Sequence, residues 1–183
     1  MTTIAFVKDT LYADTLWANA TVPAIYKPGQ SKIAYGPGNL FAYGISGAPP
    51  TQERLEANYF PKIIDLIKTF KRVGCLDRGT VEEFLKIVGN SYADCLKYTQ
   101  IVVTREFGFA VSSITSKRGD ILQPLVPGDV AAVGAGWDYF LGAYHATQCV
   151  KRAYAATAAL DHLTNNTVGA IPMSALASLD GLK

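Results

Sequence analysis

The start of the chain carries residues that can do chemistry once Met1 is removed. Thr2 then holds a hydroxyl nucleophile and an α-amine on one residue. The hydroxyl can attack an acyl carbon while the amine, with an unperturbed pKa of about 8, takes its proton. The same residues also form an ordinary first β-strand over 2–7, in which alternate side chains point to opposite sides. Both interpretations hold together, because the nucleophile would lie at the end of that strand.

Three later residues have the chemistry to assist such a nucleophile. A second strand over 10–14, joined to the first by a tight turn, predicts that Asp14 lies back near the start of the first strand, where a carboxylate can hold a cation beside Thr2. Lys32 begins a short strand over 32–35, and Gly47 follows a strand over 40–45 that is apolar on both faces. The Gly47 N–H is a candidate oxyanion donor. The alternatives are a polar strand end for Asp14, a solvated charge for Lys32 and an ordinary loop for Gly47.

The remaining elements predict an α+β chain. Strands and helices come in runs without βαβ alternation, which favours helices layered on antiparallel sheets. A helix from Thr51 is expected to kink at Pro61 and end at Gly74. The other expected elements are a helix over 80–88, strands over 99–105, 108–115, 121–124 and 130–133, a single long helix over 137–160, and a short final strand.

Length, charge and cysteine content argue against several classes of function. A chain of 183 residues fits one domain, 1–183, for which we expect a mobile C-terminal tail over 173–183. The net charge of +2 and the lack of a Lys/Arg block argue against nucleic acid as a partner. No apolar run reaches the roughly 18 residues that span a bilayer, so we expect no membrane association. Three cysteines without metal spacing and two isolated histidines predict a cytoplasmic protein with no metal and no cofactor.

Several short motifs, in order along nearly the whole chain, resemble the N-terminal-nucleophile hydrolases of the proteasome β-subunit kind. The most similar branch is the bacterial proteasome-like peptidase HslV and its phage relatives. The motifs are Thr2-Thr3-Ile4, Ala13-Asp14, Lys32-Ile33, Gly44-Ile45-Ser46-Gly47, Gly119-Asp120-Ile121-Leu122-Gln123-Pro124, Val133-Gly134-Ala135-Gly136 and Asp161-His162-Leu163-Thr164.

This resemblance implies a four-layer αββα sandwich with the Ntn-hydrolase fold, and it implies catalytic roles. Thr2 would be the nucleophile and its freed amine the base. Lys32 would lower the pKa of the Thr2 hydroxyl by its charge, with Asp14 holding Lys32. The Gly47 N–H would stabilise the oxyanion. Two further residues, Asp161 and Thr164, match the family's supporting pair near the nucleophile's amine.

The resemblance also implies a substrate site and partners. Ile45, Ala18 and Ser46 are assigned to substrate binding, with Ile45 at the base of the pocket for the residue that precedes the cut. An isoleucine there suggests a shallow apolar pocket. The implied assembly is a ring-shaped homo-oligomer that cleaves peptides or unfolded proteins, with an AAA+ ATPase as a further partner.

One position departs from the family pattern. The family's Gly-Ser-Gly serine hydrogen-bonds the terminal amine, whereas this chain has Ala135, and losing that hydroxyl costs about 1 kcal/mol or more of positioning. Three hypotheses therefore stand: a threonine peptidase, a catalytically inactive proteasome-like assembly protein, and an N-terminal-nucleophile amidohydrolase that acts on a small molecule.

Overall fold

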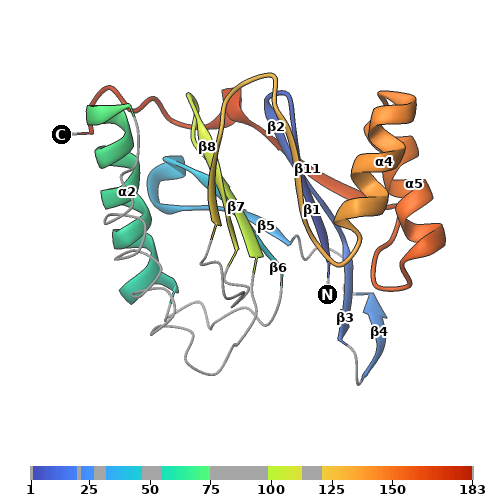
Figure 1. Cartoon of the computed structure of the whole chain (residues 1–183). Coiled ribbons are helices and arrows are strands. Elements are labelled where there is room, and N and C mark those ends of the chain that lie inside the picture. The colour runs from blue at the N-terminus through green and yellow to red at the C-terminus, as the bar shows by residue number, and fades with distance from the viewer. Residues whose placement is uncertain are drawn as a thin grey trace.

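Four layers of secondary structure follow one another across the molecule (Figure 1). The computed structural model describes residues 2–19, 22–26, 32–46, 55–74, 99–112 and 121–182. Helix α2 (Phe60–Val73) forms one outer layer, and helices α4 (Trp137–Thr147) and α5 (Val150–Leu160) form the other. Two antiparallel sheets lie between them. The predicted α+β sandwich, with two antiparallel sheets between helix layers, is confirmed.

The strands of each sheet come from distant parts of the chain, and all neighbouring strands are antiparallel. Because β1 is central in its sheet, the start of the chain is enclosed by β2 on one side and β10 on the other. The first sheet has the order β10 (Val130–Gly134), β1 (Thr3–Val7), β2 (Thr10–Asp14) and β11 (Val168–Pro172). The second has the order β5 (Ile33–Tyr35), β6 (Ala42–Ser46), β7 (Thr99–Val103), β8 (Gly108–Ser112) and β9 (Ile121–Leu125), and β3 (Leu16–Asn19) pairs with β4 (Val22–Tyr26).

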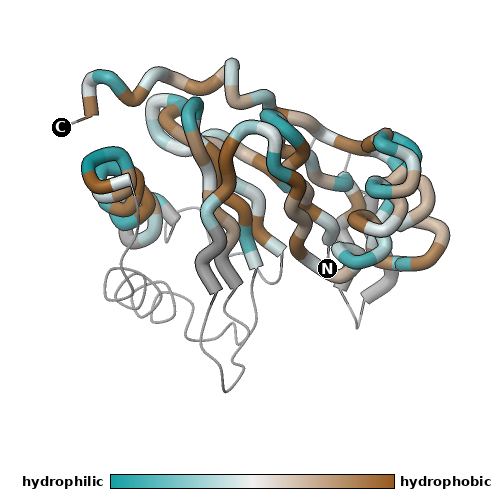
Figure 2. Tube along the Cα trace, turned by 45° about the horizontal axis from the view of Figure 1, so that its top comes forward, coloured by the Kyte–Doolittle hydropathy of each residue, from teal (hydrophilic) through white to brown (hydrophobic). Residues whose placement is uncertain are grey.

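Three apolar cores fill the spaces between the four layers. Strand β1 contributes to two of them, because its side chains alternate between its two faces. Ile4 and Phe6 join the core between the sheets, while Ala5 and Val7 join the core under α4 and α5. The third core lies between α2 and the five-stranded sheet. The hydrophobic stretches of the strands accordingly lie inside, between the helix layers (Figure 2).

Helix α2 ends at Gly74 as predicted, but it begins at Phe60 rather than at Thr51, so Pro61 lies at its start and not at a kink inside it. A π-helical turn over Leu55–Tyr59 precedes it, and Pro61 lies in its first turn, where a missing N–H costs no helical hydrogen bond. Gly74 ends the helix in the left-handed conformation, with φ of 70°. Its apolar face, which includes Ile63 and Ile67, is fully buried against the five-stranded sheet.

The single helix expected over 137–160 is wrong, because the chain breaks into α4 and α5. Gln148 adopts a left-handed conformation with φ of 51° and ends α4, and Cys149 is extended before α5 begins. A straight helix of that length would span roughly 36 Å, about twice the length of a five-residue strand. The break lets both halves bury side chains over one sheet, and the rings of Phe140 and Tyr154 lie 4.9 Å apart between their centroids. His145 on α4 is exposed.

The remaining expected features concern the second helix, the membrane and the C-terminal segment. The helix over 80–88 lies outside the described residues. In the described part of the chain, no helix has the length and hydrophobicity needed to cross a membrane. Leu176 and Leu179, in the C-terminal segment, are buried in the cores. The single-domain organisation and the mobility of the tail stay predictions.

Candidate active site

The hairpin of β1 and β2 brings Asp14 to the start of the chain. A two-residue turn at Lys8 and Asp9 joins the strands, with Lys8 at φ of 62°, and the register pairs Ile4 with Ala13. The residue after Ala13 therefore lies beside Thr3 and Thr2. This placement, expected from the lengths of the two strands, is what the structure has.

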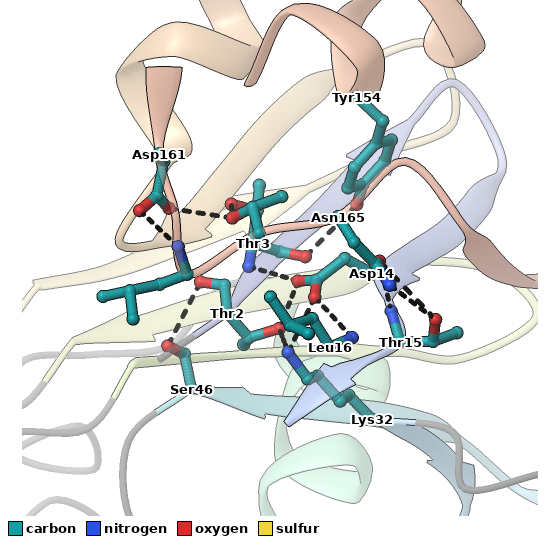
Figure 3. Close-up of polar contacts among 12 residues, drawn as sticks. Thr2, Thr3, Asp14, Thr15, Leu16, Lys32, Ser46, Tyr154, Asp161 and Asn165 are labelled. Carbon is teal, nitrogen blue, oxygen red and sulfur yellow. Dashed lines mark hydrogen bonds and ion pairs between the residues drawn. The ribbon is translucent and has the colours of Figure 1, made fainter. Parts of the chain in front are cut away.

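The Asp14 carboxylate is fully buried and accepts four hydrogen bonds (Figure 3). Its Oδ2 accepts from Thr2 Oγ1 at 2.5 Å and from the Thr3 N–H at 2.8 Å. Its Oδ1 accepts from Lys32 Nζ at 2.8 Å and from the Leu16 N–H at 2.9 Å. A carboxylate has about four acceptor positions, so each of them is filled. The carboxylate is thereby fixed in orientation as well as in place.

Lys32 immediately precedes β5, and its side chain extends into the same cluster. Its Nζ donates to Thr2 Oγ1 at 2.5 Å and forms an ion pair with Asp14 at 2.8 Å, and its side chain is only 5 % exposed. Burial lowers the pKa of Lys32, and this effect outweighs the charge of Asp14 and its hydrogen bond, which both raise it. Lys32 therefore releases a proton more readily than a lysine in water.

The Thr2 hydroxyl lies between these two groups, accepting from Lys32 and donating to Asp14. The Thr2 carbonyl oxygen is also held, by the Ala135 N–H at 2.9 Å and by Ser46 Oγ at 3.4 Å. The close approach of the chain at residue 134 to the Thr2 carbonyl oxygen requires glycine. A Cβ on Gly134 would lie 1.8 Å from this oxygen, and the φ angle of Gly134 is 102°, in the left-handed region. Thr2 itself is 3 % exposed, and Met1 lies outside the described residues.

A second polar cluster adjoins the first through Thr3. The Asp161 carboxylate accepts from Thr164 Oγ1 at 2.8 Å and from the Leu163 N–H at 3.0 Å. Thr164 Oγ1 also lies 2.8 Å from Thr3 Oγ1. Asp161 and Thr164 are thus adjacent to the residue that follows Thr2. Their predicted role beside the α-amine stays a prediction.

The structure brings together most of the residues chosen from the sequence. Thr2, Asp14 and Lys32 are in mutual contact, and Ser46 contacts the Thr2 carbonyl. Ile45 is 9 % exposed and packs in the core on the α2 side of its sheet, on the face opposite Ser46. Its place in a substrate pocket stays a prediction.

Two of the chosen residues have no described contacts. Gly47 lies outside the described residues. Ala18 lies on β3, and nothing is described of its side chain. Among the His, Cys, Asp and Glu side chains that are described, no group of three or more is placed to hold a metal ion.

Sequence reasoning missed Thr3 and Tyr154 as members of the site. Tyr154, on α5, is fully buried and donates its hydroxyl to the Thr3 carbonyl at 3.3 Å. Burial, followed by the charge of Asp14, raises the pKa of Tyr154 well above its usual value. Nothing in an alanine-rich helical pattern distinguishes this tyrosine from a packing residue. For Thr3, the available signal was its position next to Thr2.

Comparison with solved structures shows that the fold of this chain is a known one. The crystal structure of eukaryotic HslV from Trypanosoma brucei matches with a TM-score of 0.66 and 17 % identity, over 92 % of this chain and 97 % of that one. The chain therefore has the fold of HslV. Structures of BPH from Thiobacillus denitrificans match as well, with TM-scores of 0.58 for BPH and 0.56 for its complex with epoxomicin. Their identities are 17 % and 16 %, over 92 % and 93 % of this chain and 96 % of each of those chains.

The HslV likeness agrees with the recognition made from the short motifs. It extends over most of the chain. No protein-family model matches the sequence, and no curated protein matches it either. At these identities the likeness concerns the proteasome-like Ntn fold and not the chemistry of the site.

Proposed function

We propose that the chain is a threonine peptidase of the proteasome-like kind, with Thr2 as its nucleophile once the residues before it are removed. One observation carries the proposal: the buried Thr2 hydroxyl lies 2.5 Å from Lys32 Nζ and 2.5 Å from Asp14 Oδ2. A hydroxyl placed between a cation and a fixed carboxylate is typical of an activated nucleophile. The fold shared with HslV and with epoxomicin-bound BPH supports the same reaction class.

The proposed reaction uses both functional groups of Thr2. Cleavage of the bond before Thr2 frees an α-amine with a pKa of about 8. The amine takes the hydroxyl proton as Oγ1 bonds to the carbonyl carbon of the substrate peptide, and the carbonyl oxygen becomes negatively charged. The Gly47 N–H is the donor that the sequence assigns to this oxygen. The amine then gives its proton to the leaving nitrogen as the C–N bond breaks. Water hydrolyses the remaining ester and restores the hydroxyl.

Lys32 and Asp14 act on the charge that develops on Oγ1. The Lys32 ammonium donates to this oxygen, so it stabilises negative charge there, and burial makes the attraction stronger than in water. Asp14 holds Lys32 in place through the ion pair. In the structure the Thr2 hydroxyl donates its proton to Asp14. The proposed reaction therefore requires the hydroxyl to rotate, so that its proton points toward the amine before attack.

The proposal includes a homo-oligomeric ring in the cytoplasm, with peptides or unfolded proteins as substrates and an AAA+ ATPase as a further partner. The outer helix layer supports an oligomer, because three large apolar side chains are exposed on it: Trp137 by 49 %, Tyr139 by 43 % and Leu160 by 65 %. Light scattering of the purified protein measures the assembly. A monomer at all concentrations would remove this part of the proposal and leave the chemistry of Thr2 to be tested separately.

A second candidate function is an inactive proteasome-like assembly protein. Ala135 favours it, because the resemblance expects a serine hydroxyl at that position. The backbone N–H of Ala135 still binds the Thr2 carbonyl at 2.9 Å, so the position keeps one contact with the nucleophile's residue. A particle that assembles, keeps the residues before Thr2 and cleaves nothing would fit this second function.

Intact mass before and after an epoxyketone inhibitor distinguishes the two functions. The reagent forms a ring with a threonine hydroxyl and its free amine, so it reports both groups at once. We expect a chain that begins at Thr2 and gains one adduct, and Thr2→Ala should gain none. A processed chain that remains unlabelled under conditions that label a proteasome control would refute the peptidase proposal.

A further inference from the structure

The direction of the hydrogen bonds in the second cluster follows from a count of protons. A threonine hydroxyl has one proton to donate. Thr164 donates its proton to Asp161 Oδ2 at 2.8 Å, so it accepts at its contact with Thr3. Thr3 Oγ1 is therefore the donor, and the chain of hydrogen bonds runs from Thr3 to Thr164 to Asp161.

Thr3 is fully buried, and a different side chain holds each of its three polar groups. Its N–H donates to Asp14 Oδ2 at 2.8 Å, its hydroxyl donates to Thr164, and its carbonyl accepts from Tyr154 at 3.3 Å. The oxygen of Asp14 that binds the Thr3 N–H is the same one that accepts from the Thr2 hydroxyl. Thr3 thus joins the cluster around Lys32 to the cluster around Asp161.

The loop after β10 leaves room for this hydroxyl. A Cβ on Gly136 would lie 2.6 Å from Thr3 Oγ1 and 3.1 Å from Asp161 Oδ2, so a side chain there would displace the chain of hydrogen bonds. The residue before it, Ala135, has no hydroxyl. Within the described residues, the side-chain hydroxyl that reaches Thr164 from the start of the chain is that of Thr3.

We propose that Thr3 is a positioning residue for the reaction at Thr2, acting through its hydrogen bond to Thr164; this inference rests on the proposed threonine-peptidase function. The peptide unit between Thr2 and Thr3 is held at its carbonyl by Ala135 and at its N–H by Asp14. The hydrogen bond of the Thr3 hydroxyl fixes Thr3 itself, the residue that follows this peptide unit. It limits the rotation that would move the Thr2 hydroxyl away from Lys32. Attack needs this geometry, whereas binding of substrate does not.

The test compares Thr3→Val with Thr3→Ser. Valine keeps the shape of threonine and removes the hydroxyl, while serine keeps the hydroxyl. We expect kcat of Thr3→Val to fall roughly 5- to 10-fold with KM within about twofold, since one positioning hydrogen bond is lost. Thr3→Ser should recover most of kcat. The rate of epoxyketone labelling should follow kcat in both variants.

Thr104→Val is the matched control for a loss of stability. Thr104 is equally buried, and its hydroxyl donates to the Phe107 carbonyl within the turn between β7 and β8, at the other end of the sheet from Ser46. We expect it to lower the unfolding midpoint without changing kcat of the folded enzyme. The double variant Thr3→Val/Thr164→Val should lose no more kcat than the larger of the two single losses, because Thr164→Val already removes the acceptor of the Thr3 hydroxyl.

Each other outcome overturns the inference in a distinguishable way. If Thr3→Val keeps the wild-type kcat, or if Thr104→Val loses as much, Thr3 has no positioning role while the peptidase proposal stands. Failure of serine to recover kcat, or additive losses in the double variant, overturns it as well. If the processed wild-type chain neither cleaves peptides nor reacts with the epoxyketone, the proposed function fails, and the positioning role fails with it.

Discussion

Lys32→Met separates the chemistry of the site from its contribution to folding. Methionine keeps the length and the apolar stem of lysine and removes the charge. In the structure the Asp14 side chain is 0 % exposed and lies 2.8 Å from Lys32 Nζ. Removing one partner of a buried ion pair costs about 3–5 kcal/mol in the free energy of unfolding, because a charge is left without its counter-ion. Three other donors to Asp14 remain, so we expect the lower end of that range.

The effect of Lys32→Met on turnover should be larger than its effect on folding. The variant loses the donor 2.5 Å from Thr2 Oγ1, and removing one donor aimed at a developing charge costs about 100- to 1000-fold in kcat. The assay is hydrolysis of a fluorogenic peptide, below the unfolding midpoint of the variant and with the folded fraction measured by circular dichroism. Lys68→Met, an exposed lysine of α2, is the control for loss of a charge alone.

A second variant keeps this prediction testable if Lys32→Met folds poorly. Adding Asp14→Asn removes the uncompensated charge, so the double variant should recover part of the lost stability but none of the turnover. If folded Lys32→Met cleaves the peptide within about twofold of the wild-type rate, the electrostatic role assigned to Lys32 is wrong. That outcome would leave the peptidase function standing, because the wild-type chain would still cleave the peptide, and would remove only the role of Lys32.

Three further changes probe the surroundings of Thr2. Gly134→Ala would place a Cβ 1.8 Å from the Thr2 carbonyl oxygen, so we expect a loss of about 3 kcal/mol or more in the free energy of unfolding and loss of epoxyketone labelling; wild-type melting and labelling would contradict the close approach. Ala135→Ser supplies the hydroxyl found in the resembled family, and we expect kcat to rise about two- to tenfold; an unchanged kcat would mean that the site does not use it. The raised pKa of Tyr154 means that the unfolded chain loses this proton first as pH rises past 10.0, so the free energy of unfolding falls there with increasing pH. Tyr154→Phe should reduce that slope in urea unfolding at alkaline pH, and equal slopes in both proteins would contradict the assignment.

Local sequence patterns predict those parts of the fold that depend on residues close together in the chain. Alternation over 2–7 and 10–14, with a tight turn between, predicts both the hairpin and the arrival of Asp14 near Thr2. The end of α2 at Gly74 follows from the conformational freedom of glycine, whereas Pro61 lies at the start of the helix and not at the expected kink. Each of these features is decided within about a dozen residues.

Contacts between distant segments could not be read in the same way. Thr3 and Thr164 are 161 residues apart, and they meet because β11 pairs with β2 and carries the preceding loop to the start of the chain. No periodicity in either segment encodes that pairing. The break at Gln148 was missed for a related reason: helix propensity favours continuation, whereas the packing of both halves against β1 involves residues far away in the sequence.

The buried pair of Lys32 and Asp14 argues for chemistry more than for stability. Replacing such a pair with well-packed apolar residues is often neutral or stabilising, so folding alone gives little reason to keep it. What the pair does hold is one hydroxyl, that of Thr2, which donates to the carboxylate and accepts from the ammonium. A charged group whose pKa is shifted by burial, and whose cation meets a nucleophilic oxygen, is typical of a catalytic site.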